Sequence, residues 1–94
     1  MGIEETNVLL VKNGSEECES LKKKLEEEGI KDRFVFLEIE SEEGEGLAKV
    51  AGVDRVPKFL KLIEDKERKV LTICKLTMDL EPEECVEIAT KGSE

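Results

Sequence analysis

The stretch VLLVKNGSEECESLKKKLEEEG, residues 8–29, contains the pattern that decides the fold. It begins with the apolar run 8–11, which is too short for a helix and includes β-branched side chains. Such a run predicts a strand buried on both faces, here from Thr6 to Lys12. The sequence Asn13-Gly14-Ser15 follows at once and predicts a turn.

The second half of this stretch predicts a helix from Ser15 to Glu28. Its apolar residues Cys18, Leu21 and Leu25 recur at the spacing of one helical face. Gly29 supplies a C-terminal stop, and the Ser15 hydroxyl is suited to cap the first turn. Residues 8–29 therefore predict a strand, a turn and a helix in succession.

A second apolar run follows in the segment Arg33 to Glu40, which predicts another strand of the same buried kind. Two such strands joined by a helix form a βαβ unit, which requires parallel pairing and a right-handed crossover. Residues 41–45 are an acidic connector, and residues 47–51 predict a short helix closed by Gly52.

The rest of the chain predicts a hairpin and a last helix. Pro57 opens a third strand, Lys58 to Ile63, and a fourth strand, Val70 to Leu76, is close enough behind it to pair in antiparallel fashion. A helix is expected from about Glu81, with Pro82 at its first position. Its core face would carry four residues: Cys85, Val86, Ile88 and Ala89.

The order β-α-β-α-β-β-α predicts one α/β domain over residues 1–94, with a four-stranded mixed sheet and helices on both faces. A chain of 94 residues suits a single small core. No stretch approaches the roughly 20 apolar residues of a membrane-spanning helix, and the N-terminus has no export signal. A cytoplasmic location follows by default.

The charge balance excludes two classes of partner. Charged residues make up 41% of the chain, and 24 acidic against 15 basic residues give a formal net charge of −9. This charge repels phosphate backbones and anionic lipid headgroups, so neither nucleic acid nor membrane partners are expected.

The reactive residues are few. Three cysteines at wide spacing, Cys18, Cys74 and Cys85, fit neither a secreted disulfide framework nor paired zinc knuckles. The chain has no histidine, which excludes Cys/His metal sites and Ser-His or Cys-His couples. No metal site or cofactor is predicted. Cys74 and Cys85 are expected to be buried packing residues, although a disulfide between them, or from either one to Cys18, is open.

Two motifs resemble the thioredoxin and glutaredoxin superfamily. LAKVAGVDRVP, residues 47–57, is similar to the family's segment of a helix, Gly-Val, two residues, Val or Ile, and a cis-proline. KNGSEEC, residues 12–18, is similar to the lysine-to-CxxC run of small glutaredoxin-like proteins. Together with the order of elements, the resemblance covers nearly the whole chain and implies a thioredoxin-like fold.

The resemblance also implies a binding groove. It implies a cis peptide bond before Pro57, which presents the backbone of Val56 to an extended peptide beside the first helix. Such pairing is strand addition, in which main-chain hydrogen bonds give affinity and side-chain pockets give selectivity. The residues assigned to binding are Lys12, Arg55, Val56 and Pro57.

The chain departs from the family at the nucleophile. The family's attacking cysteine falls on Ser15 and the resolving cysteine on Cys18, and a hydroxyl without a base is a weak nucleophile. A helix N-terminus favours a Cys18 thiolate, whereas Glu16 and Glu17 oppose it. The helical stripe instead directs Cys18 toward the core. Leu76-Thr77-Met78-Asp79 stands where glutaredoxins have a Gly-Gly pair, which argues against a glutathione site.

Three functions remain open from sequence. The first is a redox-degenerate module that binds a protein or extended peptide in the groove. The second is a thiol-disulfide oxidoreductase that acts through Cys18, or through a dithiol if Ser15 replaces a cysteine of the natural gene. The third is a small domain whose acidic surface serves assembly with a basic partner.

Overall fold

The computed structural model describes residues 2–89, which form a mixed α/β structure with five strands and two α-helices. The elements in chain order are β1 (Ile3–Val11), α1 (Glu16–Glu27), a 3-10 turn (Lys31–Arg33), β2 (Val35–Glu38), α2 (Glu42–Ala51), β3 (Lys58–Asp65), β4 (Val70–Leu76) and β5 (Pro82–Ala89). Within residues 2–89, neither α-helix has the length and apolar character needed to cross a membrane.

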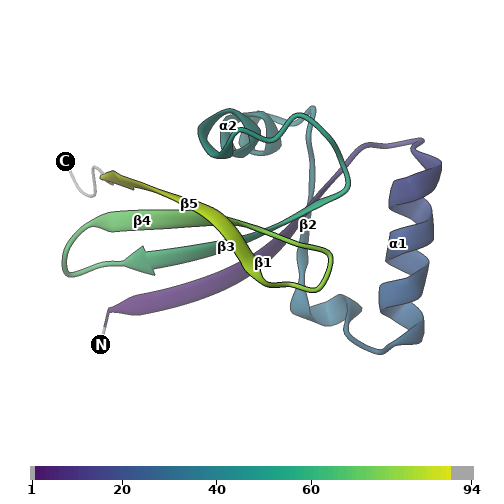
Figure 1. Cartoon of the computed structure of the whole chain (residues 1–94), viewed down its shortest axis with the longest axis horizontal. Coiled ribbons are helices and arrows are strands. Elements are labelled where there is room, and N and C mark those ends of the chain that lie inside the picture. The colour runs from purple at the N-terminus through teal and green to yellow at the C-terminus, as the bar shows by residue number, and fades with distance from the viewer. Residues whose placement is uncertain (1, 90–94) are drawn as a thin grey trace.

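The strands form a single sheet in the order β2-β1-β3-β4-β5. β1 and β2 are parallel, as the predicted βαβ unit requires, and every other neighbouring pair is antiparallel. Figure 1 shows α1 beside one end of the sheet and α2 across it, while the β3–β4 hairpin extends beyond both helices.

The two faces of the sheet each have a hydrophobic core. On one face, Leu9 and Val11 of β1 pack in a buried cluster with Cys18 of α1. On the other face, their neighbours Val8 and Leu10 pack with the buried alanines of α2. Because successive strand residues point to opposite faces, this alternation places the two helices on opposite sides of the sheet, as predicted.

Several element boundaries differ from the sequence prediction, among them the end of β3, which is Asp65 rather than Ile63. β1 begins at Ile3 rather than Thr6, because residues 3–5 pair with the end of β3. The predicted second strand over residues 33–40 is shorter, since Lys31–Arg33 form a 3-10 turn. α2 includes most of the acidic segment that was predicted to be a connector.

The early start of α2 has a local cause. The Ser41 hydroxyl caps the helix by accepting the Gly44 backbone N–H at 3.0 Å. Gly44 lies against the end of β2, where a Cβ atom would collide with the carbonyl group of Glu38. At the other end Gly52 adopts φ 73° and closes the helix, as predicted.

The predicted last helix is wrong, because Pro82–Ala89 is the edge strand β5. The physical reason is the antiparallel pairing of this segment with β4. Val86 and Ile88 also fit the period of two of a strand, and β-branched residues favour strands. Pro82 is tolerated at the first residue of an edge strand.

Cys85 therefore lies on a strand and not on the core face of a helix. Cys74 lies in β4 and is 5% exposed, as expected, whereas Cys85 is exposed. The two residues are directly opposite each other and form a disulfide, one of the pairings that the sequence left open.

Candidate functional site

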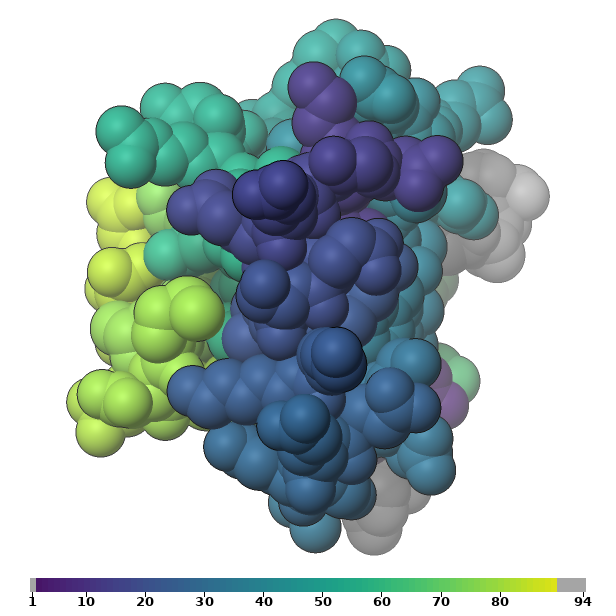
Figure 2. Space-filling view, turned by 90° about the vertical axis from the view of Figure 1, so that its right-hand side faces the viewer, coloured from purple at the N-terminus to yellow at the C-terminus, as the bar shows by residue number. Residues whose placement is uncertain are grey.

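An open groove lies between α1, the segment before β3 and the turn after β4. Its volume is about 630 Å³, within the range of about 300 to 1,000 Å³ usual for ligand pockets. Nine residues line it: Glu16, Glu17, Ser20, Leu21, Lys24, Arg55, Val56, Pro57 and Met78. Figure 2 shows α1 crossing this face of the molecule, with the residues of the β4–β5 turn beside it.

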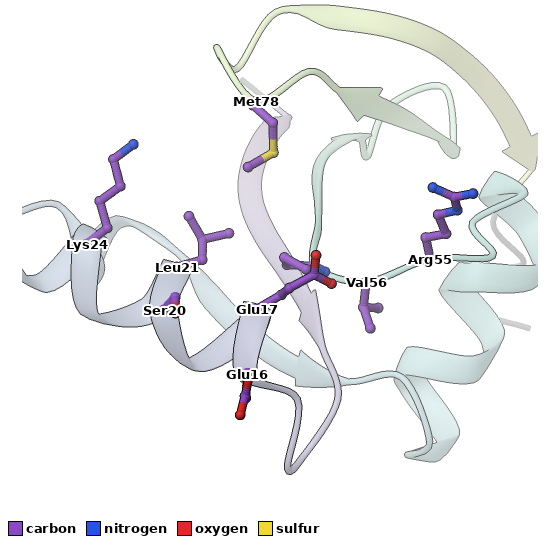
Figure 3. Close-up of a pocket in the computed structure, with 9 residues that line it drawn as sticks. Glu16, Glu17, Ser20, Leu21, Lys24, Arg55, Val56 and Met78 are labelled. Atoms are coloured by element: carbon purple, nitrogen blue, oxygen red, sulfur yellow. The ribbon is translucent and has the colours of Figure 1, made fainter.

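The centre of the groove is apolar. Leu21 of α1 and Met78 of the β4–β5 turn point toward the same space, as Figure 3 shows. Met78 is 64% exposed although it is a large apolar side chain. Leu21 and Met78 thus make the centre of the groove apolar.

Charged groups of both signs surround this centre. Glu16 and Glu17 belong to the first turn of α1, and Lys24 is further along the same helix. Arg55 stands on the other side of the groove from Lys24 (Figure 3). The groove therefore carries acidic and basic groups on its rim, in contrast to the strongly negative chain as a whole.

Val56 and Pro57 form one wall of the groove, and their peptide bond is cis, as the resemblance implies. The Val56 side chain is half-buried and packs against both hydrophobic cores. Among residues 2–89, the backbone N–H and C=O groups of Val56 have no hydrogen-bonded partner.

Ser15 is the N-cap of α1. Its side-chain oxygen accepts the backbone N–H of Cys18 at 3.3 Å, and its backbone is extended, as in an ordinary cap. The cap predicted from sequence is therefore confirmed. In this position the hydroxyl satisfies one of the free N–H groups of the helix.

Cys18 does not line the groove. The residue is 0% exposed and belongs to the core cluster between α1 and the sheet. Its sulfur accepts the backbone N–H of Lys12 at 3.4 Å. A thiolate must meet its substrate to exchange disulfides, so this arrangement makes Cys18 a packing residue.

The structure brings together three of the four residues assigned to binding. Arg55, Val56 and Pro57 line the groove, whereas the exposed Lys12 lies outside its lining. The sequence reasoning missed Leu21 and Met78. The apolar stripe that contains Leu21 predicts a face turned wholly toward the core. Met78 lies in a turn, where no periodic pattern indicates which side chains share a face.

The described residues offer no metal site. Within residues 2–89, no group of three or more Cys, Asp or Glu side chains is arranged to hold a metal ion. The free thiol in this range is the buried Cys18.

Comparisons with known proteins add no assignment: the chain matches no protein-family model, no curated protein and no solved structure.

Proposed function

We propose that this chain has a thioredoxin-like fold and acts as a redox-degenerate module that binds an extended peptide segment of a protein partner. The observation that carries the proposal is the groove itself, in which the first turns of α1 meet Val56, Pro57 and Met78 while the Cys18 thiol is turned away into the core.

Support for the fold comes from the first six elements, counting strands and α-helices. The order through β4 is β-α-β-α-β-β, with β1 parallel to β2 and β3 antiparallel to β4. This is the order that the resemblance implies, except that a fifth strand takes the place of the last helix.

Support for an extended ligand comes from the free backbone at Val56. A peptide strand placed along this residue can donate to its C=O and accept from its N–H, which is the bonding of strand addition. Because these bonds use main-chain atoms, they recognise an extended conformation and not a particular sequence.

Selectivity would come from the side chains beside this backbone. An apolar side chain of the ligand fits between Leu21 and Met78, where it would remove apolar surface from water. Glu17 lies between Leu21 and Val56 in Figure 3 and favours a basic residue next to the apolar one. We therefore propose a ligand that pairs one apolar with one basic side chain.

The burial of Cys18 favours binding over disulfide exchange. An oxidoreductase acting through this residue needs its sulfur at the surface, and Cys18 is fully buried. The alternative of a dithiol, with a natural cysteine at position 15 and Cys18 as its partner, needs a separate test. That test is to assay the Ser15→Cys variant for disulfide reductase activity.

We also propose a cytoplasmic location and a protein partner in place of nucleic acid or lipid. The location follows the expectation from the sequence, and the partner class rests on the formal net charge of −9, which repels phosphate backbones and anionic lipid headgroups.

The proposal is tested by selecting displayed random peptides on the wild-type protein and measuring the affinity of synthetic versions. Met78→Ser removes the apolar wall, and Ile3→Ser is the matched control. Ile3 is 62% exposed, close to the 64% of Met78, but lies outside the groove. Loss of one buried apolar contact should weaken binding by about tenfold in Met78→Ser.

Affinity should be unchanged in Ile3→Ser. Equal affinities of the two variants would contradict the proposed site. A failure to select any displayed peptide whose binding is blocked by an excess of the same free peptide would also contradict it. Methylating the peptide nitrogen that faces Val56 should weaken binding as well, because it removes a donor of the strand pairing.

A further inference from the structure

The Cys74–Cys85 disulfide lies far from the first turn of α1 in sequence and joins β4 to the edge strand β5. The two cysteines are opposite each other in the antiparallel register, with Cα atoms 4.0 Å apart. Close spacing is typical of pairs that do not exchange backbone hydrogen bonds. We therefore infer that the Cys74–Cys85 disulfide lies between two backbone hydrogen-bonded pairs, Ile73 with Val86 and Lys75 with Glu84.

The two ends of this disulfide differ in exposure. Cys74 is 5% exposed and belongs to the core cluster under α1, whereas Cys85 is exposed, as is every residue of β5. Attack on a disulfide proceeds at the sulfur that a thiolate can reach, and exposed disulfides are the labile, regulatory or catalytic ones. This asymmetry selects Cys85 as the point of attack.

We propose that Cys74–Cys85 is an exchange-active redox site whose co-reactant is an external dithiol. The proposal is independent of peptide binding in the groove. A thiolate of the dithiol attacks the Cys85 sulfur, the Cys74–Cys85 bond breaks, and Cys74 leaves as a thiolate that takes a proton from water.

The second thiol of the co-reactant completes the reaction. After losing its proton to water, it attacks its partner sulfur in the mixed disulfide and releases Cys85 as a thiolate, which is then protonated. The dithiol is oxidised by two electrons to a disulfide, and the protein disulfide is reduced to two thiols. Oxidation of the protein follows the same steps in reverse with a disulfide as the oxidant.

The charges around Cys85 determine which thiols react fastest. Glu83 pairs with Lys58 at 2.8 Å and Glu84 pairs with Lys75 at 2.9 Å. Glu87 lies on the same face of β5 as Cys85 and has no ion pair among residues 2–89. Its negative charge disfavours the approach of an anionic reagent and favours a cationic or neutral one.

Reduction removes the covalent attachment of the edge strand. β5 has a strand neighbour on one side alone, and its two ion pairs are exposed, so each contributes little to holding it. The reduced protein should therefore open β5 more often than the oxidised one. β4 would then become the edge of the sheet during each opening.

The first experiment measures the rate at which dithiothreitol reduces wild-type protein in urea below the unfolding transition, by mass spectrometry after acid quenching. Direct attack on the native state predicts a rate proportional to dithiothreitol concentration and unchanged by urea. A rate that rises with urea as steeply as global unfolding does would overturn the proposal, because the bond would then be reached in the unfolded chain alone.

The second experiment traps the mixed disulfide with monothiols. Cysteamine and thioglycolate, which carry opposite charges, are compared at equal thiolate concentration and low salt. The proposal predicts that the adduct lies on Cys85 and that cysteamine reacts severalfold faster. Glu87→Gln should reduce this preference, while Glu26→Gln, which changes the same charge on α1, should leave it unaltered. An adduct mainly on Cys74 would overturn the assignment.

Amide exchange supplies the structural readout. Val86 and Glu84 occupy hydrogen-bonded pairs with β4, so their amides should exchange about tenfold faster or more after reduction. Amides of the β1–β3 pairs, such as Leu9, should keep their rates. Unchanged exchange throughout β5 would contradict the release of the edge strand.

Discussion

The Ser15 hydroxyl accepts the backbone N–H of Cys18 at 3.3 Å, and the Cys18 side chain is fully buried in the core. The positions that a thioredoxin-like dithiol would occupy therefore hold a helix cap and a core residue. The Cys18 thiol therefore does not line the groove beside α1. Ser15 and Cys18 each give a testable prediction.

Ser15→Ala should lower the free energy of unfolding by about 1 kcal/mol, because it leaves an N–H group at the start of α1 without an acceptor. Ser15→Asp retains an acceptor and should preserve most of the stability. Urea denaturation at pH 7 measures both variants. Equal midpoints for Ser15→Ala and the wild type would show that the cap contributes nothing.

Cys18 should react with iodoacetamide about 100-fold more slowly, or slower still, in the folded protein than in urea, because alkylation requires an opening that costs a few kcal/mol. The rate is followed by mass spectrometry across pH 6 to 9, with Cys74 and Cys85 kept as the disulfide. Rapid labelling of native Cys18 at neutral pH would instead support the single-thiol oxidoreductase.

Two glycines of α2 form a matched pair. Gly44→Ala should destabilise the protein by about 1 to 3 kcal/mol, since the added Cβ meets the carbonyl group of Glu38. Gly46→Ala should stabilise it by about 0.5 to 1 kcal/mol, because no heavy atom lies within 4 Å of its Cβ and alanine favours a helix. Thermal unfolding of both variants measures the difference. Similar effects of the two substitutions would contradict the close contact between α2 and β2.

The ion pair between Lys75 and Glu84 gives a pH dependence. Their mutual hydrogen bond lowers the pKa of Glu84 below its ordinary value and raises the pKa of Lys75 above its ordinary value. For Glu84 the stabilisation is present above the unfolded-state pKa and is lost as the pH falls through the lowered folded-state pKa. For Lys75 it is present below the unfolded-state pKa and is lost as the pH rises through the raised one.

The wild type should thus be slightly more stable than Glu84→Gln at pH 7, and this difference should shrink as the pH falls through the lowered folded-state pKa of Glu84. Because Glu84 is exposed, the effect is small, and 1 M salt should weaken it. Urea midpoints of the two proteins, measured at pH 7 and at a series of lower pH values, test this. A difference that does not shrink as the pH falls would show that the substitution acts through something other than the ion pair.

The first part of the fold could be predicted because its signals are local. The apolar run 8–11, the turn at Asn13-Gly14-Ser15 and the helical stripe through Leu25 each depend on a few neighbouring residues. The parallel pairing of β1 and β2 then follows from the crossover geometry.

The edge strand could not be predicted in the same way. Residues 82–89 combine a proline and two glutamates that suit a helix start with apolar residues that fit either period. What decides between helix and strand is the pairing with β4, including the bond from Cys85 to Cys74, and this contact is set by the tertiary structure.

The residues of the candidate site also differ in how well the sequence predicts them. Arg55, Val56 and Pro57 could be assigned because they form one contiguous motif. Met78 joins them only through the turn that brings β5 back along β4, so its role depends on the element that the sequence did not predict.

The most direct test of the account is an amide chemical-shift map of the wild-type protein titrated with a selected peptide. The account predicts the largest shifts at residues 16–24, at Val56 and at Met78, with little change around Leu47 on the opposite face of the sheet. Largest shifts on the α2 side, or shifts spread evenly over the chain, would contradict a binding groove beside α1.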